Sequence, residues 1–571
     1  MPGHIFVTRT DIRKLSCDAW VMSADHTCAS YFFDHAAHCE WLKYIFKQLK
    51  CAPSDLHKLP DQLRPKLQPM EGAENIWEID LPRRYFANFP LLFAVGVTAM
   101  ADSNKPEEIF LTKLLIKALE IIASRLLTDK REMKLGRSKY LLAVPVVGTG
   151  EGGAAYSTGV VVRQLLDSLL EFCRKYVDFD LVLCTRDKAT FNVAQNHRLS
   201  KLHEFWEGSF VSKDSEFGEE YYKLQDIDRL ADLAVQGKLV LFIGAGVCLG
   251  AGLPTWNGLL EELAHEVNID VESDDWKSID YLTKADIIEK RLCSGGNGTV
   301  GDWIAQRMDI GTYSLQHSLL AALKCKTVVT TNYDRCYENA FHSMKLSDSP
   351  ADKISVIPIK IRKNSNFSLL KMHGCISKPE DIVLTRKHHI RYMESNVALA
   401  GIVQTSLLTS HMLFVGFSLA DENFHKIMDS VVKAKKYFSN DALLPFATSL
   451  QLFKNEFVQE LWNPEIMAIP MRPQSAKNSY FHEWSEAGRD VEIFLDLLLV
   501  RRNNIACSYL LDARFHCFLS DEEKILKDAL DTLVNDITTE QGVPLPPLLQ
   551  SYLESYGFED SFLSQIKISQ I

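Results

Sequence analysis

The stretch KLVLFIGAGVCLGAGLPTW, residues 238–256, decides the fold of the second half of the chain. An apolar run of strand length leads into Gly244, Ala245 and Gly246, and further glycines and a proline follow. A strand that enters a helix through such a loop exposes backbone N–H groups, to which a phosphate can bind. A glycine-rich tight turn without a ligand is the alternative that this stretch alone leaves open.

The spacing of these glycines excludes two common phosphate loops. A dinucleotide-binding GxGxxG motif would need glycine where Leu249 stands, and a Walker loop would need Gly-Lys followed by Ser or Thr.

Composition narrows the class of protein. A chain of 571 residues, 46% hydrophobic and 24% charged, is too long for one core and predicts two to four globular domains. Its net charge of -11 argues against sequence-independent nucleic-acid binding. No apolar run approaches the roughly 18 residues of a membrane span, and the amino terminus has no signal-peptide pattern. We therefore expect a cytoplasmic protein with neither membrane nor nucleic acid as a partner.

Hydrophobic periodicity predicts two α/β domains, each a doubly wound and mostly parallel sheet, with a helical carboxyl-terminal segment. In the first domain, residues 1–195, strands are expected in DAWVMSAD, FPLLFAVGV, YLLAVPVVG and FDLVLCTRD. A linker is expected at 196–225, the second domain at 226–500 and the helical segment at 501–571. In the second domain, strands are expected in KLVLFIGAG, KTVVTTNYD, FSLLKMHG and HMLFVGFS.

Polar residues follow three of the four strands predicted in the second domain, and the glycine loop follows the other, at the sheet edge where ligands of open α/β sheets bind. They are Thr331, Asn332 and Asp334 after one strand, His373 after the next, and Gly416, Ser418, Asp421 and Asn423 after the last. Taken singly, each could be a turn residue, a core histidine or a helix cap. Three such strand ends beside the glycine loop, in this order, favour a binding site.

The set GAGVCLGAGLPTW, TTNYD, KMHG and VGFSLADEN resembles the sirtuin-like fold, in particular the NAD-hydrolysing branch found in Thoeris-type antiviral defence effectors. The resemblance covers about residues 226–500. It implies NAD+ as substrate, bound by these residues: Gly244, Ala245, Gly246, Gly252, Leu253, Pro254, Thr331, Gly416, Ser418 and Asn423.

Two features separate this chain from the protein-deacylating sirtuins. Those enzymes carry a four-cysteine zinc module after the catalytic histidine, whereas Cys375 is the one cysteine between His373 and Gly416, and the 13 cysteines of the chain form no CxxC pair. We therefore expect no zinc. Deacylases also carry Gln-Asn-x-Asp where this chain has TNYD, the form that the resemblance associates with NAD+ cleavage.

Three residues are the candidates for catalysis, because cleavage at the ribose needs a base near its hydroxyls and an oriented water. His373 suits the base, since much of an ordinary histidine is neutral at cellular pH. Asn332 can position water and ribose without adding charge. Asp334 would orient Asn332 or stabilise positive charge, or else serve only the turn. Cys248 is expected to be a small loop filler rather than a reactive nucleophile.

The amino-terminal domain resembles macrodomains in TRTDIRKLSCDAWVMSAD and VPVVGTGEGG. The resemblance places a second ligand site at Asp11, Ile12, Gly148, Thr149, Gly150, Gly152 and Gly153. SADH, residues 23–26, stands where that family has paired asparagines, which argues against ADP-ribose hydrolysis. Binding of an ADP-ribose-like or cyclic nucleotide signal is still expected.

The resulting hypothesis is a regulated NAD+ hydrolase that releases nicotinamide and ADP-ribose, acts in antiviral NAD+ depletion and forms a homo-oligomer. Two alternatives stay open. One is NAD-dependent deacylation or ADP-ribosyl transfer, and the other is an assembly protein that binds NAD+ or ADP-ribose without turnover.

Overall fold

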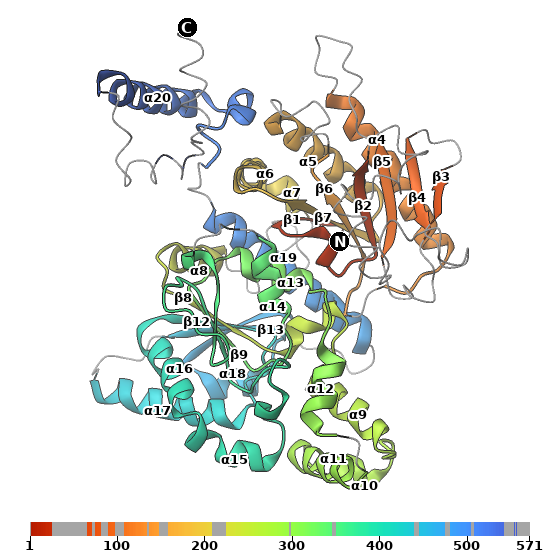
Figure 1. The fold of residues 1–571 in the computed structure, drawn as a ribbon, viewed down its shortest axis with the longest axis vertical. Coiled ribbons are helices and arrows are strands. Elements are labelled where there is room, and N and C mark those ends of the chain that lie inside the picture. Colours follow the sequence, from red (N-terminus) through yellow and green to blue (C-terminus); the bar gives the residue numbers. More distant parts are fainter. Residues whose placement is uncertain are drawn as a thin grey trace.

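A computed structural model of the chain contains two seven-stranded sheets in separate lobes (Figure 1). The structure describes residues 2–24, 66–70, 75–80, 90–96, 108–133, 136–147, 158–207, 224–295, 298–344, 346, 350–438, 445–473, 480–503, 508–541, 553 and 556. In this part of the chain, no helix combines the length and the apolar character needed to cross a bilayer.

The first lobe is built on the strand order β1-β7-β6-β2-β5-β4-β3. Strands β1, β7, β6, β2 and β5 pair in parallel, with β1 at one edge, and β4 and β3 add an antiparallel edge on the other side. The bounds are β1 Ile5–Arg9, β2 Ala19–Ala24, β3 Lys66–Pro69, β4 Ile76–Asp80, β5 Leu91–Gly96, β6 Tyr140–Pro145 and β7 Phe179–Thr185. Strands β2, β5, β6 and β7 confirm the four that the sequence predicts.

Helices cover this sheet because their apolar residues recur at helical spacing. They are α4 Glu108–Thr128, α5 Thr158–Lys175, α6 Lys188–Ser200 and α7 Leu202–Phe205. A short 3-10 helix, Ile12–Lys14, follows β1. Residues 196–207, predicted to begin a linker, instead complete α6 and form α7, and most of the remaining predicted linker lies outside the described residues.

The second lobe is a fully parallel sheet in the order β10-β11-β9-β8-β12-β13-β14. Its strands are β8 Leu239–Ile243, β9 Thr327–Thr330, β10 Ser355–Ile357, β11 Ser368–Lys371, β12 His411–Val415, β13 Ala447–Phe453 and β14 Ile466–Arg472. Strands β11, β9, β8 and β12, which carry the candidate site residues, are neighbours in the middle of this sheet. Their carboxyl ends therefore meet at one edge.

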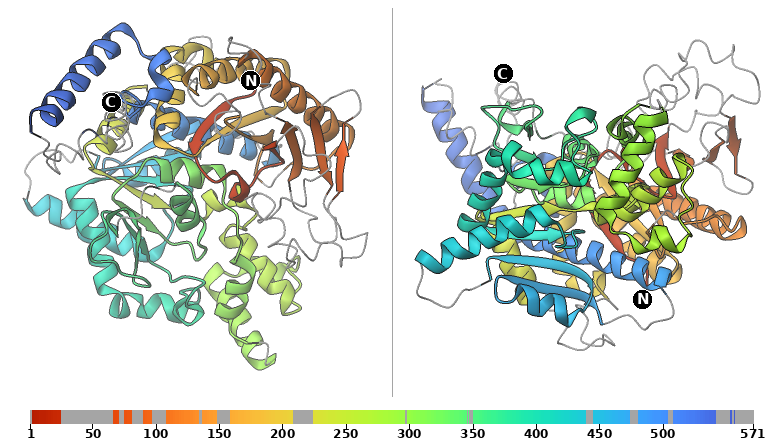
Figure 2. Two further views of the ribbon diagram at one scale, coloured as in Figure 1. Left: turned by 45° about the horizontal axis from the view of Figure 1, so that its top comes forward. Right: turned by 90° about the horizontal axis from the view of Figure 1, so that it is seen from below.

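Helices lie on both faces of this sheet, as a parallel sheet requires. They are α8 Leu224–Val235, α13 Leu315–Ala322, α14 Cys336–Ser343, α15 Arg386–Ser395, α16 Val397–Thr409, α17 Glu422–Phe438, α18 Glu456–Trp462 and α19 Tyr480–Arg502. Four more helices, α9 Trp256–Glu266, α10 Asp274–Ser278, α11 Tyr281–Gly295 and α12 Val300–Met308, form an arm that projects from this lobe (Figures 1 and 2).

Helix α19 lies between the two lobes and joins them through buried ion pairs (Figure 1). Arg489 and Arg137 both contact the buried Asp180 of β7, with N–O distances of 2.8 and 2.9 Å. Asp496 bonds to His4 at 2.9 Å and to Arg198 of α6. Removing one member of such a buried pair leaves an uncompensated charge, so α19 holds the lobes together in one arrangement.

The carboxyl-terminal segment contains helices, as predicted. After α19, the 3-10 helix Ala513–Phe518 packs against α5 of the first lobe, and α20 spans Asp521–Gln541.

Candidate active site

The glycine loop between β8 and the following 3-10 helix, Ala245–Ala251, packs backbone against backbone with the end of β12. Gly246 N donates to Gly416 O at 3.0 Å, and a Cβ on Gly244 would lie 2.3 Å from that same oxygen. Gly252 has a φ of +86°, a conformation that side chains disfavour. The glycines at 244 and 416 thus allow two strand ends to touch.

Solvent reaches only some of the residues expected to bind NAD+. Gly252, Gly416 and Ser418 are exposed, and Ala245, Gly246, Thr331 and Asn332 are half-buried. The other four are buried and support the sheet edge without reaching solvent: Gly244, Leu253, Pro254 and Asn423.

Asn332 follows β9, and its carboxamide is held by two acceptors. Its Nδ2 donates to Gly244 O at 3.0 Å and to the Cys248 sulfur at 3.2 Å. Because a carbonyl oxygen can only accept, the nitrogen of the amide must face Gly244. The acceptor oxygen of Asn332 is therefore the end left for a ligand or water.

Cys248 joins Asn332 to Asp334. Its thiol donates to Asp334 Oδ2 at 3.2 Å and lies 3.7 Å from His317 Nε2. Burial, and then the Asp334 carboxylate, raise the pKa of the Cys248 thiol well above its ordinary value. A nucleophilic thiolate is excluded by this environment, whereas a small hydrogen-bonding loop residue fits it.

Asp334 is 3% exposed and bonded on several sides. Its Oδ1 accepts from Cys336 N at 2.8 Å, and Lys371 donates to its backbone oxygen. Burial raises the pKa of Asp334, but the Lys371 ammonium and His317 outweigh burial and lower it overall. Asp334 therefore stays ionised, and Cys248 links it to Asn332 by hydrogen bonds.

His373 follows β11 and is buried, with its Nε2 3.5 Å from Asp421 Oδ2. Its ring meets those of His389 and Tyr392 edge to face, with centroids 5.3 and 5.7 Å away. Burial lowers the pKa of His373, and Asp421 offsets that only in part. The imidazole is therefore neutral at cellular pH and can accept a proton.

Several buried polar atoms around His373 have no hydrogen-bond partner in the described structure. They are His373 Nε2, His389 Nε2, the Tyr392 hydroxyl and Asn423 Oδ1. The other side of His389 is satisfied, because its Nδ1 lies 3.0 Å from Asn423 Nδ2. Leaving such groups unpaired costs about 1–3 kcal/mol each, so this cluster is prepared for a polar ligand or for water.

Two groups of described residues are spaced as metal ligands would be: Cys248 with His317 and Asp334, and His373 with His389 and Asp421. In each group the ligand atoms lie within 4.8 Å of one another. The protonated Cys248 thiol already donates to Asp334, which makes the first group a hydrogen-bonded cluster.

Sequence reasoning missed His317, His389, Tyr392 and Lys371. The first three lie on or beside helices and belong to no strand-end motif, so only the fold brings them to the site. Asp421 was noticed after β12, but its contact with His373 was not predicted.

In the first lobe, the two described residues of the predicted second ligand site contact other parts of the protein. Asp11 pairs with Arg13 at 2.7 Å, its backbone oxygen accepts from the Tyr313 hydroxyl of the second lobe, and Ile12 is buried. Gly148, Thr149, Gly150, Gly152 and Gly153 lie outside the described residues.

Asn332 and His373 thus lie at the carboxyl edge of a fully parallel sheet. The family model described as SIR2-like domain matches residues 326–463, so the chain contains such a domain.

Curated relatives match part of this chain. The NAD(+) hydrolase ThsA of Enterococcus faecium is 28% identical over 212 residues, which are 36% of this chain and 42% of the relative. Defense-associated sirtuin 2 of Bacillus subtilis is 26% identical over 214 residues, 37% of this chain and 21% of the relative. The aligned segment thus spans about two fifths or less of these relatives. A macrodomain of Oceanobacillus iheyensis, 15% identical, covers 35% of this chain and 92% of its own at a TM-score of 0.22.

Proposed function

We propose that this protein hydrolyses NAD+ at the bond between nicotinamide and ribose, giving nicotinamide and ADP-ribose, and that it does so in antiviral defence. The observation that carries the proposal is the neutral, buried His373 at the same sheet edge as the oriented amide of Asn332. The names of the ThsA and defence-sirtuin relatives support the substrate and the setting.

The leaving group contributes little to the activation barrier, because nicotinamide leaves as a neutral molecule. Most of the barrier arises at the ribose, which becomes positively charged and oxocarbenium-like as the bond breaks. Hydrogen-bond acceptors fixed before the reaction stabilise such a charge without reorganising. The outward oxygen of Asn332 is suited to hold a ribose hydroxyl or the attacking water.

His373 acts as the base in this proposal. It takes a proton from a ribose hydroxyl or from water, and the imidazolium that forms is stabilised by Asp421, 3.5 Å from Nε2. Because the ring is buried, this interaction is stronger than it would be in water. His389, whose pKa burial lowers to about 4, stays neutral and adds no opposing charge.

The test is to incubate the purified chain with NAD+ and quantify products by chromatography. The wild-type protein should release nicotinamide and ADP-ribose in equal amounts, also with EDTA present, because no zinc takes part in the proposal. Asn332→Ala should lose most of this activity, and the matched change of an exposed asparagine, Asn364→Ala, should keep it. Products that appear only with an acylated or acceptor substrate, or binding of NAD+ without products, would contradict hydrolysis.

Three further expectations stay predictions: a nucleotide signal at the Asp11 and Gly148–Gly153 region, self-association, and a cytoplasmic location. Light scattering of the purified chain measures the assembly state.

A further inference from the structure

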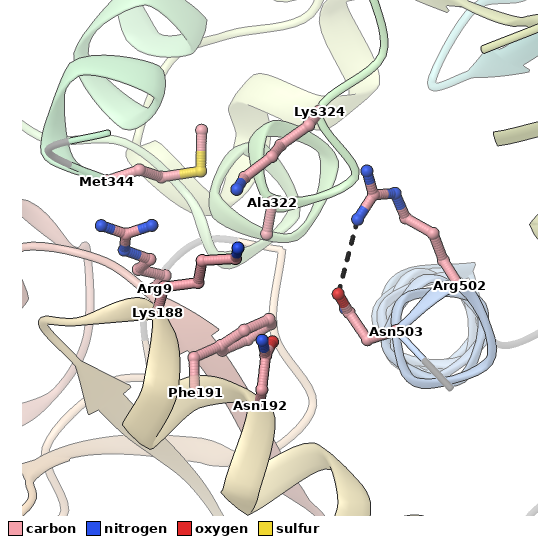
Figure 3. Close-up of a pocket in the computed structure, with 9 residues that line it drawn as sticks. All are labelled: Arg9, Lys188, Phe191, Asn192, Ala322, Lys324, Met344, Arg502 and Asn503. Carbon is pink, nitrogen blue, oxygen red and sulfur yellow. Dashed lines mark hydrogen bonds between the residues drawn. The ribbon is translucent and has the colours of Figure 1, made fainter. Parts of the chain in front are cut away.

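A basic pocket lies between the two lobes, away from the carboxyl edge that carries the candidate active site. Its volume is about 270 Å³. It is lined from five parts of the chain: β1, α6, the end of α13, the residue after α14 and the end of α19 (Figure 3). The residues that matter for its chemistry are Arg9, Lys188, Phe191, Lys324, Arg502 and Asn503.

The first lobe, the second lobe and helix α19 each contribute at least one cation. Arg9 ends β1, and Lys188 begins α6 in the first lobe. Lys324 lies just beyond the end of α13 in the second lobe, and Arg502 is the last residue of α19. Figure 3 shows the four side chains around one space, with Arg502 donating to Asn503 Oδ1 at 3.4 Å.

Two carboxylates act on these cations: burial lowers the pKa of Arg9 by more than Asp187 raises it, and lowers the pKa of Lys324 by more than Asp352 raises it. Among the described residues, Lys188, Lys324 and Arg502 have no carboxylate within ion-pair distance. The buried Nε of Arg502 also lacks a hydrogen-bond partner there. The nearby Asp187 caps α6 and lies 3.6 Å from Arg514, and so is already engaged.

Burial and mutual repulsion both lower the pKa values of these cations. Burial, and then Arg9, Arg502 and Lys188, lower the pKa of Lys324 to about 7. Burial followed by Arg9 and Arg502 lowers the pKa of Lys188. Four cations that converge with so few carboxylates beside them cost stability, so a pocket of this kind is explained better by a bound anion than by folding.

We propose that this pocket binds a small phosphate-bearing anion that bridges the two lobes. Guanidinium and ammonium groups converging on one space are the donors that phosphate oxygens prefer. The volume equals roughly nine water molecules at liquid density, which suits a diphosphate group and is too small for a nucleic-acid strand. Phe191 supplies an apolar wall beside the cations.

The cationic side chains of the pocket suit inorganic diphosphate and the diphosphate of a nucleotide equally, so the experiment includes both. Isothermal titration calorimetry of the full chain uses inorganic pyrophosphate in one arm and ADP in the other, at low ionic strength, with potassium chloride as the ionic-strength control. We expect saturable binding of at least one of them. Binding is the readout, so the result does not depend on whether the protein cleaves NAD+.

Lys324→Asn tests the assignment, because asparagine tolerates the positive φ of 51° at this position. It should weaken binding at least about tenfold, since a charged hydrogen-bond donor is lost. The matched control is Lys290→Gln, an exposed lysine of α11, which should bind as wild type does. If Lys324→Asn loses binding of both pyrophosphate and ADP, the pocket recognises the diphosphate that the two probes share. If it loses binding of ADP alone, the pocket recognises the nucleotide.

A stability measurement separates this role from a structural one. Without anion, Lys324→Asn should leave the melting temperature unchanged or raise it, because it relieves repulsion; Lys188→Gln, on an exposed side chain, should behave in the same way. If neither probe binds wild type, if Lys324→Asn binds both probes undiminished, or if both variants melt lower without anion, the proposal is wrong.

Discussion

Replacing Cys248 with alanine tests the hydrogen-bonded link behind the candidate active site. The sulfur accepts from Asn332 Nδ2 at 3.2 Å and its thiol donates to Asp334 Oδ2 at 3.2 Å. Alanine removes both interactions at once. Serine at the same position keeps a donor and an acceptor on a side chain of similar shape.

The expected losses of stability and of rate in Cys248→Ala follow from the hydrogen bonds that Asp334 and Asn332 lose. Asp334 keeps its bond from Cys336 N but loses a buried donor, so the free energy of unfolding should fall by about 1–3 kcal/mol. Asn332 keeps Gly244 O and loses one of two bonds that fix its orientation. A net bond of about 1 kcal/mol corresponds to roughly a fivefold fall in kcat.

The assay pairs urea unfolding with initial rates of NAD+ cleavage for wild type, Cys248→Ala and Cys248→Ser. Serine should recover most of the rate and stability that alanine loses. Iodoacetamide should inactivate the native wild-type enzyme slowly at pH 7, because the buried thiol stays protonated. If alanine keeps full kcat, or if iodoacetamide inactivates quickly and NAD+ protects, the positioning role of Cys248 is wrong.

Three further predictions follow from the same contacts. The rate of NAD+ cleavage should be level near neutral pH and fall in acid below the ordinary histidine range, since the lowered pKa keeps His373 neutral; Asp421→Asn should shift this fall to still lower pH, seen in a pH–rate profile. Gly244→Ala should lower the melting temperature and activity, because its Cβ would meet Gly416 O at 2.3 Å, whereas Gly311→Ala, with nothing within 4 Å, should not. Asp180→Asn should cost about 3–5 kcal/mol in urea unfolding at pH 7, and less in acid, since the buried arginines lower the pKa of this carboxyl and its stabilising effect is lost as pH falls.

The sequence predicts the architecture well where apolar runs are strong. Continuous apolar runs such as those of β6, β7, β8 and β12 are typical of buried strands in parallel sheets, and all four strands are found. The short or mixed strands β3, β10 and β14 carry weaker patterns. Their pairing is set by the neighbouring strand rather than by their own residues, so the sequence does not predict them.

The same contrast holds for the candidate site. Asn332 and His373 come directly after predicted strands, and the order of strands in the sheet brings their ends to one edge. His389 and Tyr392 reach His373 from α15 and could not be predicted, because helix packing places them. The basic pocket was also missed, since Arg9, Lys324 and Arg502 are far apart in sequence.

The central claim is that His373 acts as a base on NAD+ bound at this sheet edge. The most direct test measures kcat and the Kd for NAD+ of His373→Ala beside His265→Ala, the same change on an exposed helix surface. His373→Ala should lower kcat about 100- to 10,000-fold and leave the Kd within a few-fold of wild type, while His265→Ala changes neither. Undiminished turnover by His373→Ala would contradict the account.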